Sequence, residues 1–285
     1  GGRGIRLVEP PEDLEAAITA AKQEALNFFG NDEVYMEKFI VNPKHIEVQI
    51  LADSYGNTVY LGERDCSMQR RNQKVLEETP SPIMTPELRA KMGKAAVAAA
   101  KACEYTNAGT IEFLVDADRN FYFMEMNTRI QVEHPITEAV TGIDLVKQQI
   151  LIANGEKLPF AQEDITIRGH AIECRINAEN PALNFRPSPG QITALHIPGG
   201  PGIRVDSSAY QGYTIPPYYD SMIAKLIVHA PTREEAIAKM KWALAEFIVD
   251  GVDTNIDFQL SLIRDSLFEK GTYDIGYLGR KLSGK

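Results

Sequence analysis

The sequence predicts an α+β fold with an antiparallel sheet, organised as two domains. The 285 residues, of which 44% are apolar and 24% charged, fit about two domains whose cores need no disulfide or metal for stability. Short alternating segments separated by turn residues recur along the chain, as expected where neighbouring strands are joined directly. Helical periodicity is confined to a few segments between them. We expect a first domain over residues 1–158 and a second over residues 159–285.

Composition excludes several classes of function. The formal net charge of −9 argues against general affinity for nucleic acid or anionic lipid, although a local basic patch can still bind a small anion. No apolar run approaches the roughly 18 residues of a spanning helix, so we predict no membrane protein. Cys66, Cys103 and Cys174 are odd in number and widely spaced, which favours a reducing cytoplasm. The chain opens Gly-Gly-Arg-Gly without Met, and we expect its natural beginning to be missing.

In the first domain, a helix is expected over residues 11–29, because apolar residues recur at helical spacing between Pro11 and Gly30. Alternating segments then predict strands, and Thr85-Pro86-Glu87 begins an Ala-rich helix that ends near residue 104. A further helix is expected from residue 136 to residue 153, ending at Asn154-Gly155. The predicted strands are residues 34–40, 46–52, 58–62, 109–116 and 120–127.

The second domain is expected to be α+β. Residues 165–229 consist mostly of strand and turn patterns, punctuated by Pro and Gly. Thr232 to Glu235 forms a capping box, and the apolar residues behind it predict a helix. A last helix is expected over residues 255–268.

A pair of glutamates is the most informative local feature. Residues 110–116 and 121–127 predict a hairpin with residues 117–120 as its loop, which places Glu112 opposite Glu125. Carboxylates about 5 Å apart on one sheet face repel each other unless a cation lies between them. Asn127 shares that face and adds a neutral oxygen, and such all-oxygen sites favour Mg²⁺ or Mn²⁺. The alternative is an exposed hairpin whose acidic residues face solvent.

Other candidate ligand contacts each have a structural alternative. Gly1 and Gly2 begin a glycine-rich segment that fits a phosphate loop, a simple turn or a cloning remnant. The basic run 69–74 fits an anion-binding loop between a strand and a helix, or a solvated surface. Residues 129–134 offer an arginine, an amide and a carboxylate after the metal strand, a set suited to a small oxyanion and a general base. Taken alone, Glu173 and Arg175 fit an ion pair within a sheet.

Four segments carry a resemblance to a known family: residues 64–71, 125–135, 169–179 and 216–222. In these segments, and over essentially the whole chain, the sequence resembles biotin carboxylase. The resemblance implies an ATP-grasp fold with an antiparallel sheet, followed by a biotin carboxylase C-terminal α+β domain, and an absent N-terminal domain. It also implies the reaction, in which ATP activates bicarbonate as carboxyphosphate and the carboxyl group passes to biotin on a carrier protein.

The resemblance implies a role for each matching position. It implies that Mg²⁺ (or Mn²⁺) is bound by Glu112, Glu125 and Asn127, which agrees with the hairpin argument. It makes Glu133 the base that deprotonates bicarbonate and Arg175 the residue that stabilises the biotin enolate, in place of the ion pair with Glu173. The remaining implied contacts are Gly1 and Gly2 in the phosphate lid, Glu37, Lys38, Ile40 and Leu114 for adenine, His45, Gln69 and Asn72 for ribose, and Lys74, Arg129, Gln131 and Val132 for bicarbonate. Asn72 departs from the histidine that many relatives carry.

The expected assembly is the biotin carboxylase component of an acetyl-CoA carboxylase in fatty-acid synthesis. It implies a biotin carboxyl carrier protein, carboxyltransferase subunits and a homodimer to which Arg204 contributes. The same domain of a pyruvate or propionyl-CoA carboxylase shares these motifs. A non-catalytic fragment that folds and self-associates is a further alternative, because upstream lysines that hold ATP phosphates in the family are absent from this sequence.

Overall fold

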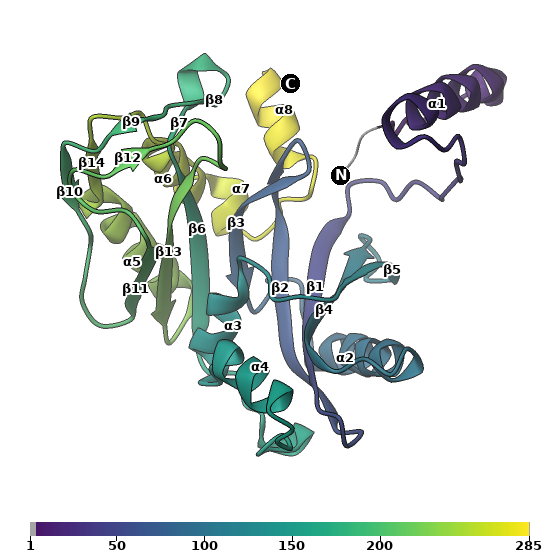
Figure 1. The fold of residues 1–285 in the computed structure, drawn as a ribbon, viewed down its shortest axis with the longest axis horizontal. Helices are drawn as coiled ribbons and strands as arrows, with labels where there is room; N and C mark the ends of the chain where they lie inside the picture. The colour runs from purple at the N-terminus through teal and green to yellow at the C-terminus, as the bar shows by residue number, and fades with distance from the viewer. Residues whose placement is uncertain (1–3, 285) are drawn as a thin grey trace. The chain divides into compact units, whose positions relative to one another are not determined.

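The structure, a computed structural model, describes residues 4–284 and divides into two units (Figure 1). The first unit comes before Pro43, and the second extends from Pro43 to the C-terminus. The predicted domain boundary at residue 158 lies within the second unit and stays a prediction. Gly1 and Gly2, the predicted phosphate-lid residues, lie outside the described residues.

The first unit contains one long helix, as predicted. A 3-10 turn, η1 (Pro11–Asp13), leads into α1 (Leu14–Phe29). Gly30 ends the helix in the left-handed conformation, φ 71°, and its N–H donates to the Leu26 carbonyl at 3.0 Å. A residue without Cβ adopts this cap at little cost.

The strand predicted over residues 34–40 is wrong. Residues 31–40 have no regular secondary structure, although apolar and polar residues alternate there. A strand requires a hydrogen-bonded neighbour, and the regular elements described in the first unit are helical. Tyr35 and Met36 are largely exposed, so the alternation does not correspond to a buried sheet face.

An eight-stranded sheet in the order β11-β13-β6-β3-β2-β1-β4-β5 is the centre of the second unit (Figure 1). Each neighbouring pair is antiparallel, which confirms the predicted fold class. Its strands are β1 (Lys44–Ala52), β2 (Thr58–Arg70), β3 (Gln73–Thr79), β4 (Asn107–Val115), β5 (Phe121–Asn127), β6 (His170–Asn177), β11 (Ile203–Ser207) and β13 (Met222–Ala230).

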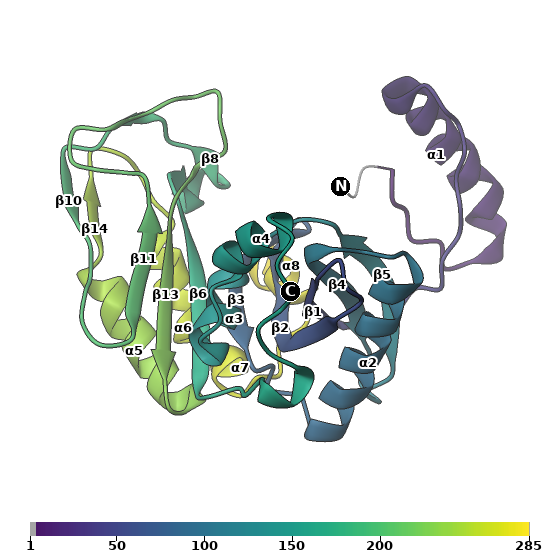
Figure 2. The same ribbon diagram turned by 60° about the horizontal axis from the view of Figure 1, so that its bottom comes forward.

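Helices cover both faces of the sheet (Figure 2). On one face, α2 (Pro86–Ala102) packs against β1 and β2, and α5 (Arg233–Glu246) packs against β6 and β13. On the other face, α3 (His134–Thr141) packs against β2, β3, β6 and β13, and α4 (Leu145–Ala153) packs against β4. Alternate residues of β1 follow this division. Ile46, Val48 and Ile50 join the core under α2, whereas the polar residues between them face the α3 side.

Two segments that were each predicted to form one helix form two helices each in the structure. The segment 136–153 is α3 and α4, because Gly142 ends α3 at φ 72° and the Asp144 side chain caps α4 by accepting from the Lys147 N–H. The segment 255–268 is α6 (Ile256–Ile263) and α7 (Ser266–Glu269), with Asp265 capping the second. The predicted starts of α2 and α5 are confirmed: Thr85 and Thr232 are their caps.

The basic run 69–74 is a hairpin turn between two strands, not a loop between a strand and a helix. Strand β2 extends to Arg70 rather than ending at residue 62, and β3 begins at Gln73. Arg71 and Asn72 both have positive φ, 51° and 62°, the combination that a tight two-residue hairpin requires. The turn places Lys74 on a strand of the main sheet.

Short elements complete the second unit. Two-stranded sheets pair β7 with β8, β9 with β12 and β10 with β14. None of the helices among residues 4–284 is both long and apolar enough to cross a membrane. The remaining bounds are η2 (Gln162–Asp164), β7 (Glu179–Asn180), η3 (Pro181–Leu183), β8 (Arg186–Pro187), β9 (Gly190–Gln191), β10 (Ala194–His196), β12 (Thr214–Ile215), β14 (Ile248–Asp250) and α8 (Tyr277–Ser283).

Candidate active site

Glu112 and Glu125 are cross-strand partners on β4 and β5, as the sequence predicts. The Asn127 amide joins them, because Nδ2 donates to Glu112 Oε1 at 2.9 Å and to Glu125 Oε1 at 3.2 Å. All three side chains therefore lie together on one face of the sheet. Glu125 is exposed, whereas Glu112 is buried. The pair is thus open on the side of the edge strand.

The register of the hairpin is correct at the glutamates and wrong at its tip. Phe121 pairs with Val115, not with Asp116. A shift between Glu112 and Phe113 leaves Met124 without a direct partner on β4 and restores the predicted register. Such a bulge adds one residue to one strand.

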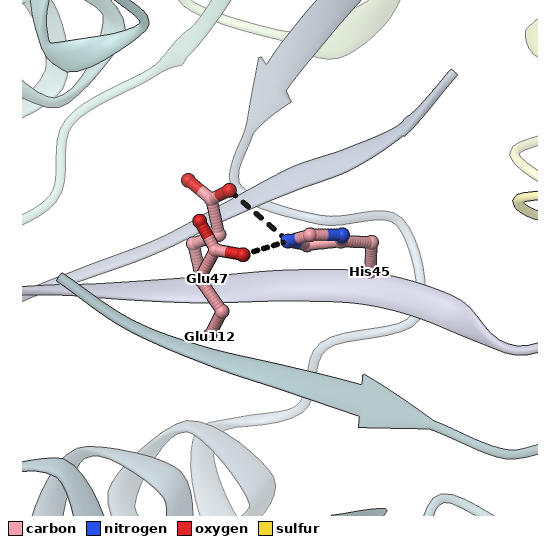
Figure 3. A group of neighbouring side chains, drawn as sticks. All are labelled: His45, Glu47 and Glu112. Carbon is pink, nitrogen blue, oxygen red and sulfur yellow. Dashed lines mark ion pairs between the residues drawn. The ribbon is translucent and has the colours of Figure 1, made fainter. Parts of the chain in front are cut away.

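Glu47 on β1 lies beside this pair and was not predicted. It is the cross-strand partner of Glu112 and is fully buried. Figure 3 shows the His45 ring pointing from one side toward the two neighbouring carboxylates: its Nε2 lies 3.1 Å from Glu47 Oε1 and 3.0 Å from Glu112 Oε2. Burial alone would lower the pKa of His45, but the neighbouring carboxylates of Glu112 and Glu47 raise it to about 9. An imidazolium ion therefore pairs with both carboxylates.

Lys74 connects this group to Glu133. Its Nζ ion pairs with Glu47, with Glu112 at 3.2 Å and with Glu133 at 2.6 Å. Burial opposes the charged form, but the three carboxylates together outweigh it and raise the pKa of Lys74 above its usual range. Burial also acts against ionisation of Glu47, whereas Lys74 and His45 lower the pKa of Glu47 below its usual range. The lysine is thus an ammonium ion shared by three carboxylates.

Arg64 on β2 is a second site residue that was not predicted. Its side chain is 0% exposed. Its guanidinium donates hydrogen bonds to the side chains of Glu47, Gln49, Thr110 and Gln131. The bond to Gln131 Oε1 is 2.8 Å, and Gln131 Nε2 donates in turn to Glu112 Oε1 at 2.7 Å. Arg64 therefore fixes which end of the Gln131 amide faces the glutamates.

Arg175 on β6 reaches Glu133 from the other side. Its Nη2 donates to Glu133 Oε2 at 2.9 Å, and its Nε donates to Glu77 Oε1 at 2.7 Å. The ion pair between Glu173 and Arg175 that the residues alone favoured is not formed. Neither carboxylate oxygen of Glu173 has a hydrogen-bond partner among residues 4–284. Arg175 instead forms an ion pair with Glu77, a β3 residue that was not predicted as part of the site.

Among the remaining predicted site residues of the second unit, Gln69, Leu114 and Arg129 adjoin this group. Gln69 Nε2 lies 2.9 Å from His45 Nδ1, and Leu114 is the cross-strand partner of His45. Arg129 is exposed, and its guanidinium donates to Asn127 Oδ1 at 3.1 Å. The Val132 carbonyl accepts from Lys225 Nζ at 2.9 Å. Asn72 lies at the tip of the β2–β3 hairpin and is exposed.

Glu37, Lys38 and Ile40 belong to the first unit. They lie in the segment without regular structure rather than on a strand, so their predicted adenine contact remains a prediction.

The donor atoms near Glu112 fit a divalent cation. Two carboxylates and an amide lie on one sheet face, and rotation of the Asn127 amide would present an oxygen in place of its nitrogen. His45, Glu47 and Glu112 also bring potential ligand atoms within 4.8 Å of one another. An imidazolium ion has no lone pair to offer, however, so His45 acts as a cation rather than as a ligand.

Two protein-family models match successive segments of the chain. Residues 1–161 match the carbamoyl-phosphate synthase L chain, ATP binding domain, and residues 173–280 match the biotin carboxylase C-terminal domain. The chain belongs to the biotin carboxylase family. The second match confirms that the biotin carboxylase C-terminal domain follows the ATP-binding domain, as the four motifs indicated.

Individual relatives support the assignment to the biotin carboxylase family. The chain is 57% identical over 279 residues to biotin carboxylase 1 of Bacillus subtilis, covering 98% of the chain and 62% of that relative. It is 56% identical to a pyruvate carboxylase subunit from Methanothermobacter thermautotrophicus, covering 95% of the chain and 55% of that protein.

A solved structure supports the fold. The biotin carboxylase domain dimer of Hydrogenobacter thermophilus 2-oxoglutarate carboxylase, in complex with MgADP, ADP and bicarbonate, matches with a TM-score of 0.93 and 51% identity, covering 98% of this chain and 62% of that one. The chain thus spans less than two thirds of the length of each of these three proteins.

Proposed function

We propose that the protein containing this chain carboxylates biotin on a carrier protein, using ATP and bicarbonate. The observation that carries the proposal is the arrangement of Lys74, Glu133 and Arg175 next to the paired carboxylates Glu112 and Glu125. A metal–nucleotide complex and a small oxyanion would meet at this place. The solved relative in complex with MgADP and bicarbonate supports these two ligands.

We assign the steps to residues as follows. Glu133 is 2% exposed and is held at both oxygens, by Lys74 and Arg175, so it is fixed in place to accept the bicarbonate proton. Lys74, Arg129, Gln131 and the Val132 backbone hold the resulting anion, which attacks the γ-phosphate of ATP and displaces ADP to give carboxyphosphate. Carboxyphosphate then splits into CO₂ and phosphate, and the ureido nitrogen of biotin bonds CO₂ as its proton passes to the phosphate. Arg175 stabilises the negative charge on the biotin enolate.

Three residues would hold a divalent cation and the others would hold nucleotide. Glu112, Glu125 and Asn127 would bind Mg²⁺ or Mn²⁺, which would neutralise charge on the ATP phosphates. His45 and Gln69 form one buried pair and are proposed ribose contacts. The adenine contacts are Glu37, Lys38, Ile40 and Leu114, the phosphate lid includes Gly1 and Gly2, and Asn72 completes the nucleotide set.

Replacement of Glu133 by Gln tests the assignment of the base. The amide keeps the volume of the side chain but cannot accept a proton, so biotin-dependent ATP cleavage by the full-length protein should fall at least about 10²-fold. Nucleotide affinity, measured by calorimetric titration with MgATP, should remain nearly unchanged. Glu156→Gln, at an exposed glutamate outside the site, is the control. Full turnover by Glu133→Gln would show that another group is the base.

We further infer that the protein serves an acetyl-CoA carboxylase in fatty-acid synthesis, as a cytoplasmic homodimer with a carrier protein and carboxyltransferase subunits. The free thiols Cys66, Cys103 and Cys174 support a reducing compartment, and the dimer in the solved relative supports self-association. A pyruvate carboxylase role is the alternative, because one of the relatives of similar identity belongs to a pyruvate carboxylase. Carboxyl transfer from the carboxylated carrier, supplied with acetyl-CoA, propionyl-CoA or pyruvate and the native transferase, would distinguish them.

A further inference from the structure

Glu173 is a buried acid for which the proposed reaction has no use. It lies on β6, is 0% exposed, and has no partner for either carboxylate oxygen among residues 4–284. Its cross-strand neighbour on β3 is another fully buried acid, Glu77. Directly opposite residues of an antiparallel pair lie on the same face with Cβ atoms about 5 Å apart. Two buried carboxyl groups thus face each other across the β3–β6 pair.

The surroundings of Glu173 are largely apolar. Its cross-strand partner on β13 is Ile227, and Ala171 precedes it by two residues on the same face of β6. These two side chains form a buried cluster with Ile136 and Val140 of α3, the helix that covers this face. Burial in such a site disfavours the ionised form of a carboxyl group.

The nearby cations are bound to other groups. Arg175 shares its guanidinium between Glu77 and Glu133. Lys225 donates to the Val132 carbonyl and lies 3.6 Å from Asp206. Lys74 is held by Glu133 and the two site glutamates on β1 and β4. Within the part of the chain that the structure describes, Glu77 therefore has a cation at one of its oxygens, whereas Glu173 has none.

These contacts indicate where one proton resides. One cation shared with Glu133 does not offset the charge of two neighbouring carboxylates in a buried site, so one of the two keeps its proton. Burial and the neighbouring Glu77 raise the pKa of Glu173 well above its usual range. Burial also raises the pKa of Glu77, to about 7, although Arg175 acts in the opposite direction. The acid without a cation is the one that stays neutral.

We propose that Glu77 and Glu173 carry a single negative charge between them, with the proton on Glu173, so that Glu77 alone can hold Arg175 beside Glu133. Glu173 is in this sense a positioning residue for Arg175. The protonation follows from the buried pair itself, whereas its consequence for Arg175 rests on the proposed function.

Infrared spectroscopy of the 285-residue chain tests the protonation directly. At about pH 8.5, above the pKa of about 7 of Glu77, we expect a C=O stretching band of a protonated carboxyl group, and Glu173→Gln should abolish it. Glu78→Gln is the matched control on the same strand as Glu77, because Glu78 is fully buried but bonds His170, Arg233 and Tyr273. That variant should keep the band. Absence of the band from the folded unmodified chain would overturn the proposal, whether or not either variant folds.

The pH profile of the full-length protein tests the positioning role. When Glu173 ionises, a second negative charge competes for Arg175 and draws it away from Glu133, so biotin-dependent ATP cleavage should decline on the alkaline side. Glu173→Gln cannot ionise and should move that decline to higher pH. An unchanged alkaline limb would overturn the positioning role. Absence of any cleavage by the unmodified protein would instead count against the proposed function and would leave the infrared result intact.

Discussion

At the scale of single residues, the buried guanidinium of Arg64 holds several site side chains in place by donating hydrogen bonds to neutral and anionic acceptors. Arg64 is fully buried and bonds side chains from β1, β4, α3 and the segment before α3. Among residues 4–284, its one carboxylate partner is Glu47. Glu47 keeps Lys74 and His45 as partners when Arg64 is removed, but the neutral acceptors of the guanidinium lose their donor, and each buried polar group left unpaired costs about 1–3 kcal/mol. A single change at Arg64 should therefore affect several elements of the site at once.

Arg64→Met should therefore lower the free energy of unfolding of the chain by about 3 kcal/mol or more. Urea denaturation followed by circular dichroism measures the change. Arg204→Met is the control, because Arg204 forms ion pairs as well, with Glu138 and Asp206, but its side chain is 44% exposed. Exposed ion pairs contribute about 0–1 kcal/mol, so the two variants should differ several-fold. Equal losses would contradict the role assigned to burial.

At the scale of elements, local pairing could be predicted from the sequence and distant pairing could not. Glu112 and Glu125 belong to consecutive strands with a short loop, so their alignment follows from counting along the chain. Glu47 and Glu77 come from β1 and β3, whose places in the sheet depend on non-local packing. The alternation of His45 with Glu47 on one face was the available signal for Glu47.

The break between α3 and α4 was not predicted, because the apolar periodicity of the sequence continues across Gly142. The structure ends α3 there at φ 72° with open space around a Cβ, so Gly142→Ala should cost about 1 kcal/mol through backbone strain alone. Gly279→Ala in α8 is the matched control, since that glycine has neither a positive φ nor a close neighbour. It should stabilise the chain by about 0.5–1 kcal/mol. Thermal unfolding would show opposite shifts, and shifts of the same sign would refute the argument.

At the scale of the whole second unit, Glu78 joins segments that are distant in sequence. From β3 it bonds His170 on β6, Arg233 at the start of α5, and Tyr273 before α8. Glu77 next to it points to the other face, where Arg175 lies. These two neighbouring buried acids therefore have different roles on opposite faces of the sheet. Glu78 connects the C-terminal helices to the sheet, and Glu77 belongs to the site.

The acid stability of the chain should depend on Glu78. Burial opposes its ionisation, but the bonds from His170 and Arg233 lower its pKa from 4.5 to about 2. A carboxyl group with a lowered folded-state pKa stabilises the fold above its unfolded pKa, and this stabilisation is lost as the pH falls from about 4.5 to about 2. A shift of this size corresponds to about 3 kcal/mol. Glu78→Gln should therefore lower the free energy of unfolding at pH 7, measured in urea, and flatten its decline between pH 5 and pH 2. If the free energy of unfolding of Glu78→Gln declined as steeply between pH 5 and pH 2 as that of the unmodified chain, the acid sensitivity would come from other carboxylates.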